Sequence, residues 1–369
     1  MANKTAKLGD LATYINGYAF KPADWGDTGL PIIRIQDLTG NSYQLNRYDG
    51  EYPERIEVND GDVLISWSAS LGVYVWQRGK ALLNQHIFKV VFDKLPVNKE
   101  YFVFAVEHKL AEMESKTHGA TMKHIVKKDF DATTIPYPPI EKQAEIADHL
   151  RRITSLIDRQ TEQLLLLDQL VKSRFIELFG DPVSNSMGLP TEPMTTVCAI
   201  IDGDRGKNYP KQDEFSDTGY CLFLNAKNVT ATGFSFENLM FITKEKDNAL
   251  HNGKLERGDV VLTTRGTLGN LAFYDDSVPF ENVRINSGMV ILRMKKSVMT
   301  EVFFMEQFKL QLQSIKGKIA SGSAQPQLPI STMNKIRILL APMALQEQFA
   351  AFVEQTDKSK LCGRMEVAA

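Results

Sequence analysis

Several polar and basic side chains follow short apolar runs, where they could form hydrogen bonds with the edges of nucleic-acid bases. Ser66 and Ser68 come at the end of the run that starts at residue 63, and Arg265 follows the run at 260–263. Loops at the ends of strands present such side chains to ligands. Hydroxyl, amide and guanidinium groups are the donors and acceptors that recognise base edges. These residues are therefore candidates for contacts with DNA, while a solvated loop is the alternative interpretation.

Two further segments, HGATMKHI and SGSAQPQL, occupy matching places in the two halves of the chain and combine glycine with polar side chains. These side chains can reach base edges or phosphates, and a solvated loop is again the alternative. Basic residues elsewhere are candidates for contacts with the phosphate backbone alone. The candidates from the two segments are Thr121, Lys123, His124, Ser323, Gln325 and Gln327, and the backbone candidates are Arg34, Arg205, Lys207, Lys211 and Lys227.

The chain contains no recognisable catalytic motif. Its six histidines form no HExxH motif and its three cysteines form no CxxC pair, so we expect no metal site. The run Gly203–Lys207 is too short for a phosphate-binding loop. Tyr137, Pro138 and Pro139 only faintly resemble a base-methyltransferase motif, and because they lead into a helical pattern they predict a helix start.

Composition indicates a folded protein of the cytoplasm with more than one domain. A chain of 369 residues suggests two or three domains, and a hydrophobic content of 43% allows sizeable cores. No apolar run approaches the roughly 20 residues that cross a bilayer, so we expect no membrane partner. The segment MANKTAKLGDLATY lacks the apolar core of a secretory signal, which predicts a cytoplasmic location.

The charge balance predicts no general attraction to nucleic acid. The formal net charge is −2, with 16 basic and 17 acidic residues in 1–140 and 18 basic and 17 acidic residues in 181–340. Neutralisation of phosphates supplies most of the non-specific affinity for DNA. We therefore expect the isolated chain to bind DNA weakly.

The two halves of the chain repeat one plan. VNDGDVLISWSASLG matches LERGDVVLTTRGTLG, which places Asp62 and Asp259 197 residues apart. Farther along, LLNQHIFKV matches RINSGMVIL, and PPIEKQAEIADHL matches APMALQEQFAAFV with Gln346 203 residues after Gln143. Order and spacing are both kept, which predicts an internal duplication. The paired Gly-Asp dipeptides at 61–62 and 258–259 predict turns into equivalent strands.

Each half is predicted to be a mixed α/β globule. Apolar runs bounded by Gly, Asp and Asn predict strands. Amphipathic patterns predict one helix near 100–114 and another near 301–314. The predicted strands are 32–35, 63–65 and 87–92 in the first copy and 222–224, 260–263 and 289–292 in the second.

A long helix is predicted between the two globules. Alternate steps of four and three residues from Ile146 to Leu178 meet apolar side chains at eight of ten positions, as in a coiled-coil seam. This seam predicts a helix over 141–178 that is about 57 Å long. The matching C-terminal pattern keeps only Phe349 and Val353, and the tail LCGRMEVAA loses it. The second helix is therefore predicted to be roughly half as long.

With its long helix after PPIEKQAEIADHL and its paired GDVLIS and GDVVLTTRGTLG segments, the chain resembles the specificity (S) subunit of type I restriction-modification enzymes. The similarity extends from KLGDLATYINGYAF to about Lys360. It implies an α/β fold in which a long coiled-coil helix separates two similar target-recognition globules and pairs antiparallel with a shorter C-terminal helix. The implied domains are two target-recognition domains at 1–138 and 181–340, a central spacer helix at 139–180, and a shortened spacer helix with its tail at 341–369.

The resemblance also implies a function and partners. Each globule would read one half of a bipartite, asymmetric target in double-stranded DNA, and the helices would set the spacing and dock two methyltransferase subunits. Restriction subunits that translocate DNA would join them. The S subunit would be non-catalytic and bind no cofactor, with S-adenosylmethionine, ATP and Mg expected on its partners. The alternatives are a stand-alone DNA-binding regulator and a methyltransferase-like enzyme with a degenerate cofactor site.

The shorter second helix is predicted to leave the first part of the seam without a partner in the chain. We expect Ile146, Leu150, Ile153 and Ile157 to contact the methyltransferase subunits or a second copy of the chain. The candidates for subunit contacts along both helices are Ile146, Leu150, Ile153, Ile157, Leu164, Leu167, Val171, Leu178, Phe349 and Val353.

Overall fold

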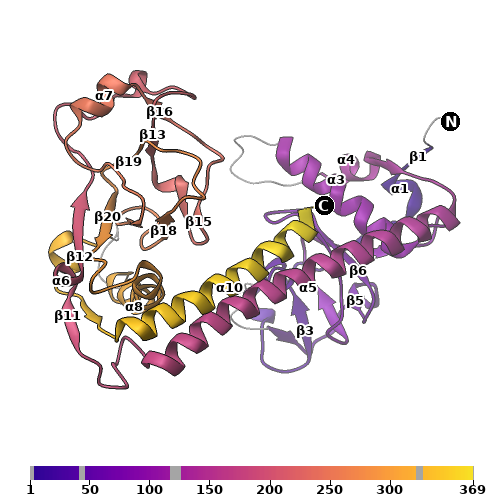
Figure 1. Cartoon of the computed structure of the whole chain (residues 1–369). Helices are drawn as coiled ribbons and strands as arrows, with labels where there is room; N and C mark the ends of the chain where they lie inside the picture. The colour runs from indigo at the N-terminus through magenta and orange to yellow at the C-terminus, as the bar shows by residue number, and fades with distance from the viewer. Residues whose placement is uncertain (1–3, 41–45, 117–125, 321–326, 369) are drawn as a thin grey trace. The chain divides into compact units, whose positions relative to one another are not determined.

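The computed structural model describes residues 4–40, 46–116, 126–320 and 327–368. The chain divides into two compact units, Met1–Asp158 and Arg159–Ala369. The boundary lies inside helix α5 (Ile140–Phe179), which is one continuous helix of 40 residues (Figure 1). The long helix predicted over 141–178 is therefore confirmed. It starts directly after Pro138 and Pro139, as a proline before the first turn favours.

Two four-stranded sheets form the first unit. The central sheet is antiparallel throughout, and in the second sheet β3 and β8 run parallel. The central sheet has the order β2-β9-β6-β7 (Thr13–Asn16, Ile87–Val91, Val63–Ser66, Gly72–Val75), and the second has the order β4-β3-β8-β5 (Arg47–Tyr48, Leu30–Ile33, Ala81–Leu83, Glu57–Val58).

Strand β6 is buried on both faces, which explains its uninterrupted apolar run. Val63 and Ile65 face the core that includes Phe102 of helix α3 (Lys99–Lys116), whereas Leu64 faces the core of the second sheet. Successive side chains of a strand point to opposite faces, so a strand covered on both sides must be apolar at every position. The central sheet is thus the middle layer of the unit.

Short elements complete the first unit. Strands β1 and β10 pair antiparallel beside the central sheet's helices. The bounds of these elements are Thr5–Lys7 for β1, Leu8–Leu11 for α1, Pro22–Asp24 for η1, Ile35–Leu38 for α2, Glu54–Ile56 for η2, Lys127–Ala132 for α4 and Thr134–Pro136 for β10.

The second unit repeats this architecture, and the predicted duplication is confirmed. Its central sheet has the order β12-β20-β17-β18, and in its second sheet β13 and β19 run parallel as β3 and β8 do. Helix α8 (Glu301–Ala320) takes the place of α3. The strands of the central sheet are Cys198–Asp202, Met289–Met294, Asp259–Thr263 and Leu271–Tyr274, and the second sheet contains β16 (Phe241–Ile242), β13 (Cys221–Leu224) and β19 (Val283–Ile285).

The remaining elements of the second unit are short, apart from the C-terminal helix. Strands β11 and β21 pair antiparallel, as β1 and β10 do in the first unit. Their bounds are Thr191–Pro193 for β11, Met194–Val197 for α6, Gln212–Glu214 for η3, Ala226–Asn228 for η4, Val229–Thr230 for β14, Gly233–Phe234 for β15, Lys244–Ala249 for α7, Ile330–Met333 for α9, Arg337–Leu339 for β21 and Met343–Ala368 for α10.

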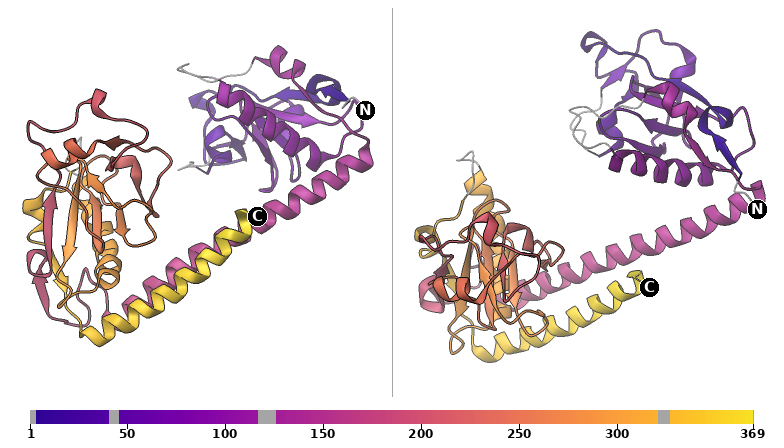
Figure 2. Two further views of the ribbon diagram at one scale, coloured as in Figure 1. Left: turned by 45° about the horizontal axis from the view of Figure 1, so that its top comes forward. Right: turned by 90° about the horizontal axis from the view of Figure 1, so that it is seen from above.

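Helix α10 packs antiparallel against the second half of α5 (Figure 2). The ring of Phe349 lies 5.5 Å from that of Phe175, while Lys360 Nζ lies 2.8 Å from a carboxylate oxygen of Asp168. Residue numbers therefore rise along one helix as they fall along the other. The Phe rings sit in the core that also holds Phe303 of α8, so the helix pair and the globular part of the second unit share one core.

Helix α10 is shorter than α5, as predicted, but it has 26 residues and continues to Ala368. The expectation that LCGRMEVAA would lose helical structure, leaving a helix half as long as α5, was wrong. Leu, Arg, Met, Glu and Ala are strong helix formers, and this local propensity outweighs the loss of the seam.

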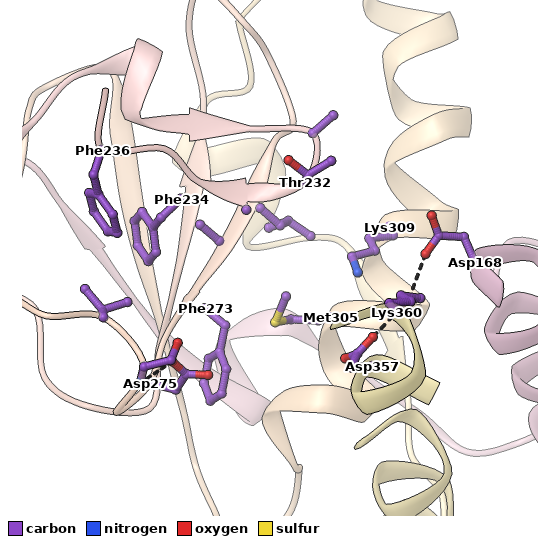
Figure 3. A pocket seen from close by; sticks show the side chains of 16 residues that line it. Asp168, Thr232, Phe234, Phe236, Phe273, Asp275, Met305, Lys309, Asp357 and Lys360 are labelled. Carbon is purple, nitrogen blue, oxygen red and sulfur yellow. Dashed lines mark hydrogen bonds and ion pairs between the residues drawn. The ribbon is translucent and has the colours of Figure 1, made fainter. Parts of the chain in front are cut away.

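A pocket of about 440 Å³ lies beside α10 in the second unit (Figure 3). On one of its walls, Lys360 is bonded to both Asp168 and Asp357. Burial alone would lower the pKa of Lys360, but these two carboxylates raise it above its ordinary value. The charged cluster thus ties the distal part of α10 to α5 while Phe349 anchors its start.

Each long helix is joined to its globule by a buried glutamine. Gln143 Nε2 donates to the Pro138 carbonyl, and its Oε1 accepts from the backbone N–H of Asn98 before α3, both at 2.8–2.9 Å. Gln346 makes the same two bonds, with Ala341 and Thr300 as partners. Both side chains are fully buried. The matched glutamines of the PPIEKQ and APMALQ segments are therefore structural.

The first predicted strand, 32–35, ends at Ile33 in the structure. Arg34 then begins the short helix α2, because its backbone N–H donates to the Asp37 carboxylate at 2.8 Å. The second unit copies this turn with Asn225 and Asn228 after β13. A side chain three residues ahead thus ends the strand at an equivalent point in each copy.

Candidate nucleic-acid interface

Four loops of the second unit meet at one edge of its sheets. Strands β12 and β17 both pair antiparallel with β20, so their C-terminal ends lie beside the start of β20. The Asn286 N–H donates to the Leu224 carbonyl, which brings the turn after β13 to the same place. The edge therefore carries the loops at 203–208, 225–228, 264–269 and 286–288.

Three of the predicted DNA-contact residues come together at this edge. Arg205, Arg265 and Gln327 line one pocket of about 330 Å³, although they lie in separate segments of the sequence. Arg265 and Gln327 form an antiparallel bridge, and the Leu328 N–H donates to the Thr264 carbonyl at 3.1 Å. Residues directly opposite one another in such a bridge point their side chains to the same face.

The two arginines of this pocket differ in their partners. Arg205 Nη2 donates to Asp202 Oδ1 at 3.1 Å and to the Ser287 carbonyl at 3.2 Å, so it fastens its own loop. Arg265 is exposed, and its guanidinium has no partner among residues 181–320 and 327–340. The other arginines of those ranges do bond to acceptors in the chain: Arg257, Arg284, Arg293 and Arg337.

Two of the predicted backbone-contact lysines lie at the same edge. Lys207 is exposed in the loop after β12, and Lys227 is exposed in η4 after β13. The Thr267 hydroxyl donates to the Ala226 carbonyl at 3.4 Å, so the η4 turn touches the loop of Arg265. Lys211 is exposed a few residues beyond the first of these loops, before η3.

The first unit builds the same edge with different side chains. The Trp67 N–H donates to the His86 carbonyl, as the Thr264 N–H donates to the Gly288 carbonyl. Trp67 Nε1 donates to Asn16 Oδ1 at 3.4 Å, and its ring lies 4.9 Å from that of His86. Aromatic and amide groups thus lie at the edge of the first unit, where the residue that matches Arg265 is Ser68.

The loops that follow β6 and β17 share their backbone conformation. Ala69 has a left-handed φ of 60°, and Gly266, its counterpart 197 residues later, has a φ of 71°. A residue with a side chain adopts this conformation at a cost of about 1–2 kcal/mol, so the loop shape is imposed in both copies. The two edges therefore present side chains of different type on a common frame.

Two candidates of the first unit have structural partners. Ser66 is fully buried and its hydroxyl donates to the Ser70 carbonyl, as Thr263 does to Thr267 in the second copy. The prediction that Ser66 is presented to DNA was wrong, because its hydroxyl closes the loop. Ser68 is half-buried in this loop, and Arg34 lies beside the Asp37 carboxylate and the Trp25 ring.

Sequence reasoning missed the roles of Asn16 and His86. The available signal was the alignment itself, because His86 falls opposite Gly288 when Asn84 is matched with Asn286. The other candidates lie outside the described residues: Thr121, Lys123, His124, Ser323 and Gln325.

The predicted subunit-contact residues fall into two groups. Leu150, Ile153 and Ile157 expose between 36% and 53% of their surface on the first half of α5, and Ile146, Leu164 and Leu167 are half-buried. Val171, Phe349 and Val353 are buried in the core of the second unit, and Leu178 packs against that core. Their prediction as surfaces for another subunit was wrong, because α5, α8 and α10 bury these side chains in one core.

The part of the chain that the structure describes contains no group of three or more His, Cys, Asp or Glu side chains that could hold a metal ion. No helix in it is both long and apolar enough to cross a membrane.

The fold defines a protein in which one α/β plan, with its loop edge, is built twice. The model of the type I restriction modification DNA specificity domain matches the chain twice, at residues 2–167 and 195–362. The chain therefore belongs to the family of type I restriction-modification specificity subunits, as the sequence predicted.

Related proteins agree with this assignment. The chain is 23% identical over 313 residues to the type I restriction enzyme EcoBI specificity subunit of Escherichia coli, a match that covers 78% of this chain and 64% of that protein. It is 24% identical over 379 residues to the MjaVIII specificity subunit of Methanocaldococcus jannaschii, covering 96% and 86%.

A solved structure shares the fold. The crystal structure of a type I restriction-modification S subunit from M. genitalium superposes with a TM-score of 0.58 at 15% identity, covering 99% of this chain and 92% of that one. At this level of identity the likeness concerns the fold, with its two α/β units and long helices.

Proposed function

We propose that this chain is the DNA-recognition subunit of a type I restriction-modification complex, and that each unit reads one half of a bipartite, asymmetric target. One observation carries the proposal: the same loop edge is built twice, on central sheets of corresponding strand order, with different side chains. Equivalent frames can present two surfaces to DNA in equivalent ways, as two-fold related proteins do. Different side chains on these frames read different sequences.

Helix α5 supports a role in spacing. At 1.5 Å per residue its 40 residues span about 60 Å, which exceeds the roughly 34–36 Å between successive major grooves. The helix enters each globular core, through Gln143 in the first unit and through Val171 and Phe175 in the second. We propose that it sets the separation of the two half-sites.

The chain itself is proposed to be non-catalytic, with chemistry left to its partners. Leu150, Ile153 and their neighbours on α5 would dock two methyltransferase subunits, and restriction subunits that translocate DNA would join the complex. S-adenosylmethionine, ATP and Mg would bind to those subunits, in the cytoplasm. The exposed apolar side chains support docking, because surfaces of this kind mark sites of interaction with other proteins.

Sequencing of DNA methylation tests the proposal. Cells that carry this chain with its methyltransferase subunits should methylate a motif with two specified parts, a gap of unspecified bases, and different sequences on either side. The same cells without the gene for this chain should lose methylation at that motif. A continuous or palindromic motif, or methylation that persists without this chain, would contradict the proposal.

A further inference from the structure

We propose that Arg265 reads a guanine in the half-site contacted by the second unit. This inference rests on the proposed function and adds to it the base that one residue recognises. It also predicts that the first unit reads its own half-site without an arginine at the matching position, where the chain has Ser68.

The Arg265 side chain is available to a ligand. Other arginines of the second unit donate to acceptors within the protein. Arg284, for example, is bonded to the buried Asp247, and Arg293 to Asp259. Arg265 is exposed and has no such partner within residues 181–320 and 327–340. A guanidinium left without an acceptor keeps all five donors for a ligand.

The backbone of Arg265 is held in a fixed position. The backbone N–H groups of Thr264 and Arg265 both donate to the Gly288 carbonyl, at 2.9 and 3.2 Å. On its other side, Arg265 is bridged to Gln327. A backbone held from two sides presents its side chain from a defined point, which lowers the entropy lost on binding.

The residues around Arg265 suit contacts with DNA. Arg265 lines a pocket with Gln327, whose amide can both donate and accept, so two side chains that suit base edges lie together there. Lys207 and Lys227 lie on the flanking loops, where single positive charges suit phosphates. In the major groove, guanine offers the two acceptors O6 and N7, which the planar guanidinium binds with two parallel bonds. This geometry distinguishes Arg265 from its lysine neighbours.

The first unit shares this backbone frame but carries different side chains on it. Ser68 is half-buried and too short to span to a base in the same way, and the adjacent Trp67 is bonded to Asn16. Its edge offers rings and an amide, which suit thymine methyl groups and adenine. We therefore expect the guanine contact in one half-site only.

Selection from a pool of random DNA duplexes tests the inference on the full chain assembled with its methyltransferase subunits. The native complex should enrich a split motif that contains a G·C pair in the second half-site. Arg265→Ala and Arg265→Lys should both lose the preference at that single pair by about tenfold or more. Preference for the other half-site should stay unchanged, and it serves as an internal check that the variant is folded.

Arg265→Lys distinguishes base recognition from charge, because lysine keeps the positive charge but lacks the planar guanidinium that forms two parallel bonds. Lys207→Ala is the matched control, and it should weaken binding to every sequence alike. The inference is overturned if Arg265→Lys keeps the native preference, if Arg265→Ala lowers the affinity for all sequences equally, or if the affected pair is A·T. Failure of the proposed function itself would be recognised differently, because the native complex would then enrich no split motif.

Discussion

Gln143 and Gln346 illustrate how a single side chain fixes the start of a long helix. Each is fully buried and bridges a carbonyl just before its own helix to the backbone N–H that precedes the neighbouring helix. A buried amide that keeps both bonds contributes modestly, but removing it leaves two backbone groups without partners. The two copies therefore use the same pair of hydrogen bonds where each long helix meets its unit.

Substituting Gln143 by Leu should destabilise the first unit by about 1–3 kcal/mol, because Asn98 N–H and the Pro138 carbonyl lose their partners. Urea unfolding followed by far-UV circular dichroism measures the change. Gln163→Leu, at an exposed position of α5, is the control and should have little effect. Equal stability of the native chain and Gln143→Leu would refute the structural role of this bond pair.

The environment of Asp247 predicts that the stability of the second unit falls in acid. Burial raises the pKa of this carboxyl group, but bonds from Lys254 and Arg284 outweigh burial and hold the pKa below its ordinary value. A group with a depressed pKa in the folded state stabilises the fold above its unfolded pKa of about 3.9, and this contribution is lost as the pH falls through the folded value.

Asp247→Asn should therefore destabilise the second unit at pH 7 by about 3 kcal/mol, since Arg284 stays buried without its counter-ion. The difference between native and variant proteins should shrink as the pH is lowered below about 4. Guanidinium unfolding at several pH values provides the measurement. Asp276→Asn, a fully exposed carboxylate, is the control, and a pH-independent difference for Asp247→Asn would contradict the linkage.

Residue roles at the loops were the hardest features to predict from the sequence. Ser66 and Ser68 look alike in the sequence, yet they differ in the structure. Ser66 is the last residue of β6 and is fully buried, whereas Ser68 lies in the loop after the strand and is half-buried. The pairing of Arg265 with Gln327 joins residues 62 positions apart through a backbone bridge, which no local pattern encodes. The residue types were predictable, whereas their grouping depends on tertiary structure.

At the scale of elements, α5 carries two different surfaces along its length. Its second half supplies Val171, Phe175 and Phe179 to the core of the second unit. Its first half exposes Leu150, Ile153 and Leu156, of which Leu156 is 58% exposed. An apolar stripe of this kind is costly in water, so it is expected to be covered in the assembled complex.

The double substitution Leu150→Asp and Ile153→Asp should prevent assembly with the methyltransferase subunits while leaving the chain folded, because both side chains are exposed. Copurification and size-exclusion chromatography with light scattering measure assembly. Val183→Asp, which changes an exposed apolar residue after the end of α5, should assemble normally. Normal assembly of the double variant would exclude this stripe as the docking surface.

The elements themselves were largely predictable because their patterns are periodic. The strand after Gly61 and Asp62 and its copy after Gly258 and Asp259 were placed correctly, since Gly61 and Gly258 have φ values of 88° and 97° that glycine favours. The end of α10 was not, because a helix can continue on local propensity after its apolar seam stops. The periodicity of apolar residues indicates which face of a helix is packed, whereas the end of the helix depends on local helix propensity.

For the whole molecule, the balanced charge indicates that base recognition and electrostatic attraction to DNA have different sources. Basic residues such as Arg284 and Arg293 are paired with carboxylates, so they neutralise the protein's own charge. Lys207, Lys227 and Arg265 remain as a small exposed set at one edge. We therefore expect the chain to supply base contacts without supplying most of the electrostatic attraction to phosphates.

The isolated chain should bind double-stranded DNA only in the range of non-specific binding, with a Kd of about 10⁻⁶ to 10⁻⁴ M. Fluorescence anisotropy with a labelled duplex at two salt concentrations measures this affinity. Lys207→Ala with Lys227→Ala should weaken even this binding, which shows that it involves the same edge. Nanomolar, salt-insensitive binding by the isolated chain would overturn the division between recognition and attraction.

The repeated glutamine joint has a consequence for how such proteins can diversify. Each unit is held to its long helix by the same pair of hydrogen bonds. A unit exchanged at one of these junctions would therefore find the same hydrogen-bond partners at the other. Recombination at these points would exchange one unit and preserve the rest of the chain. Under the proposed function, a small number of units would then combine into a larger number of bipartite targets.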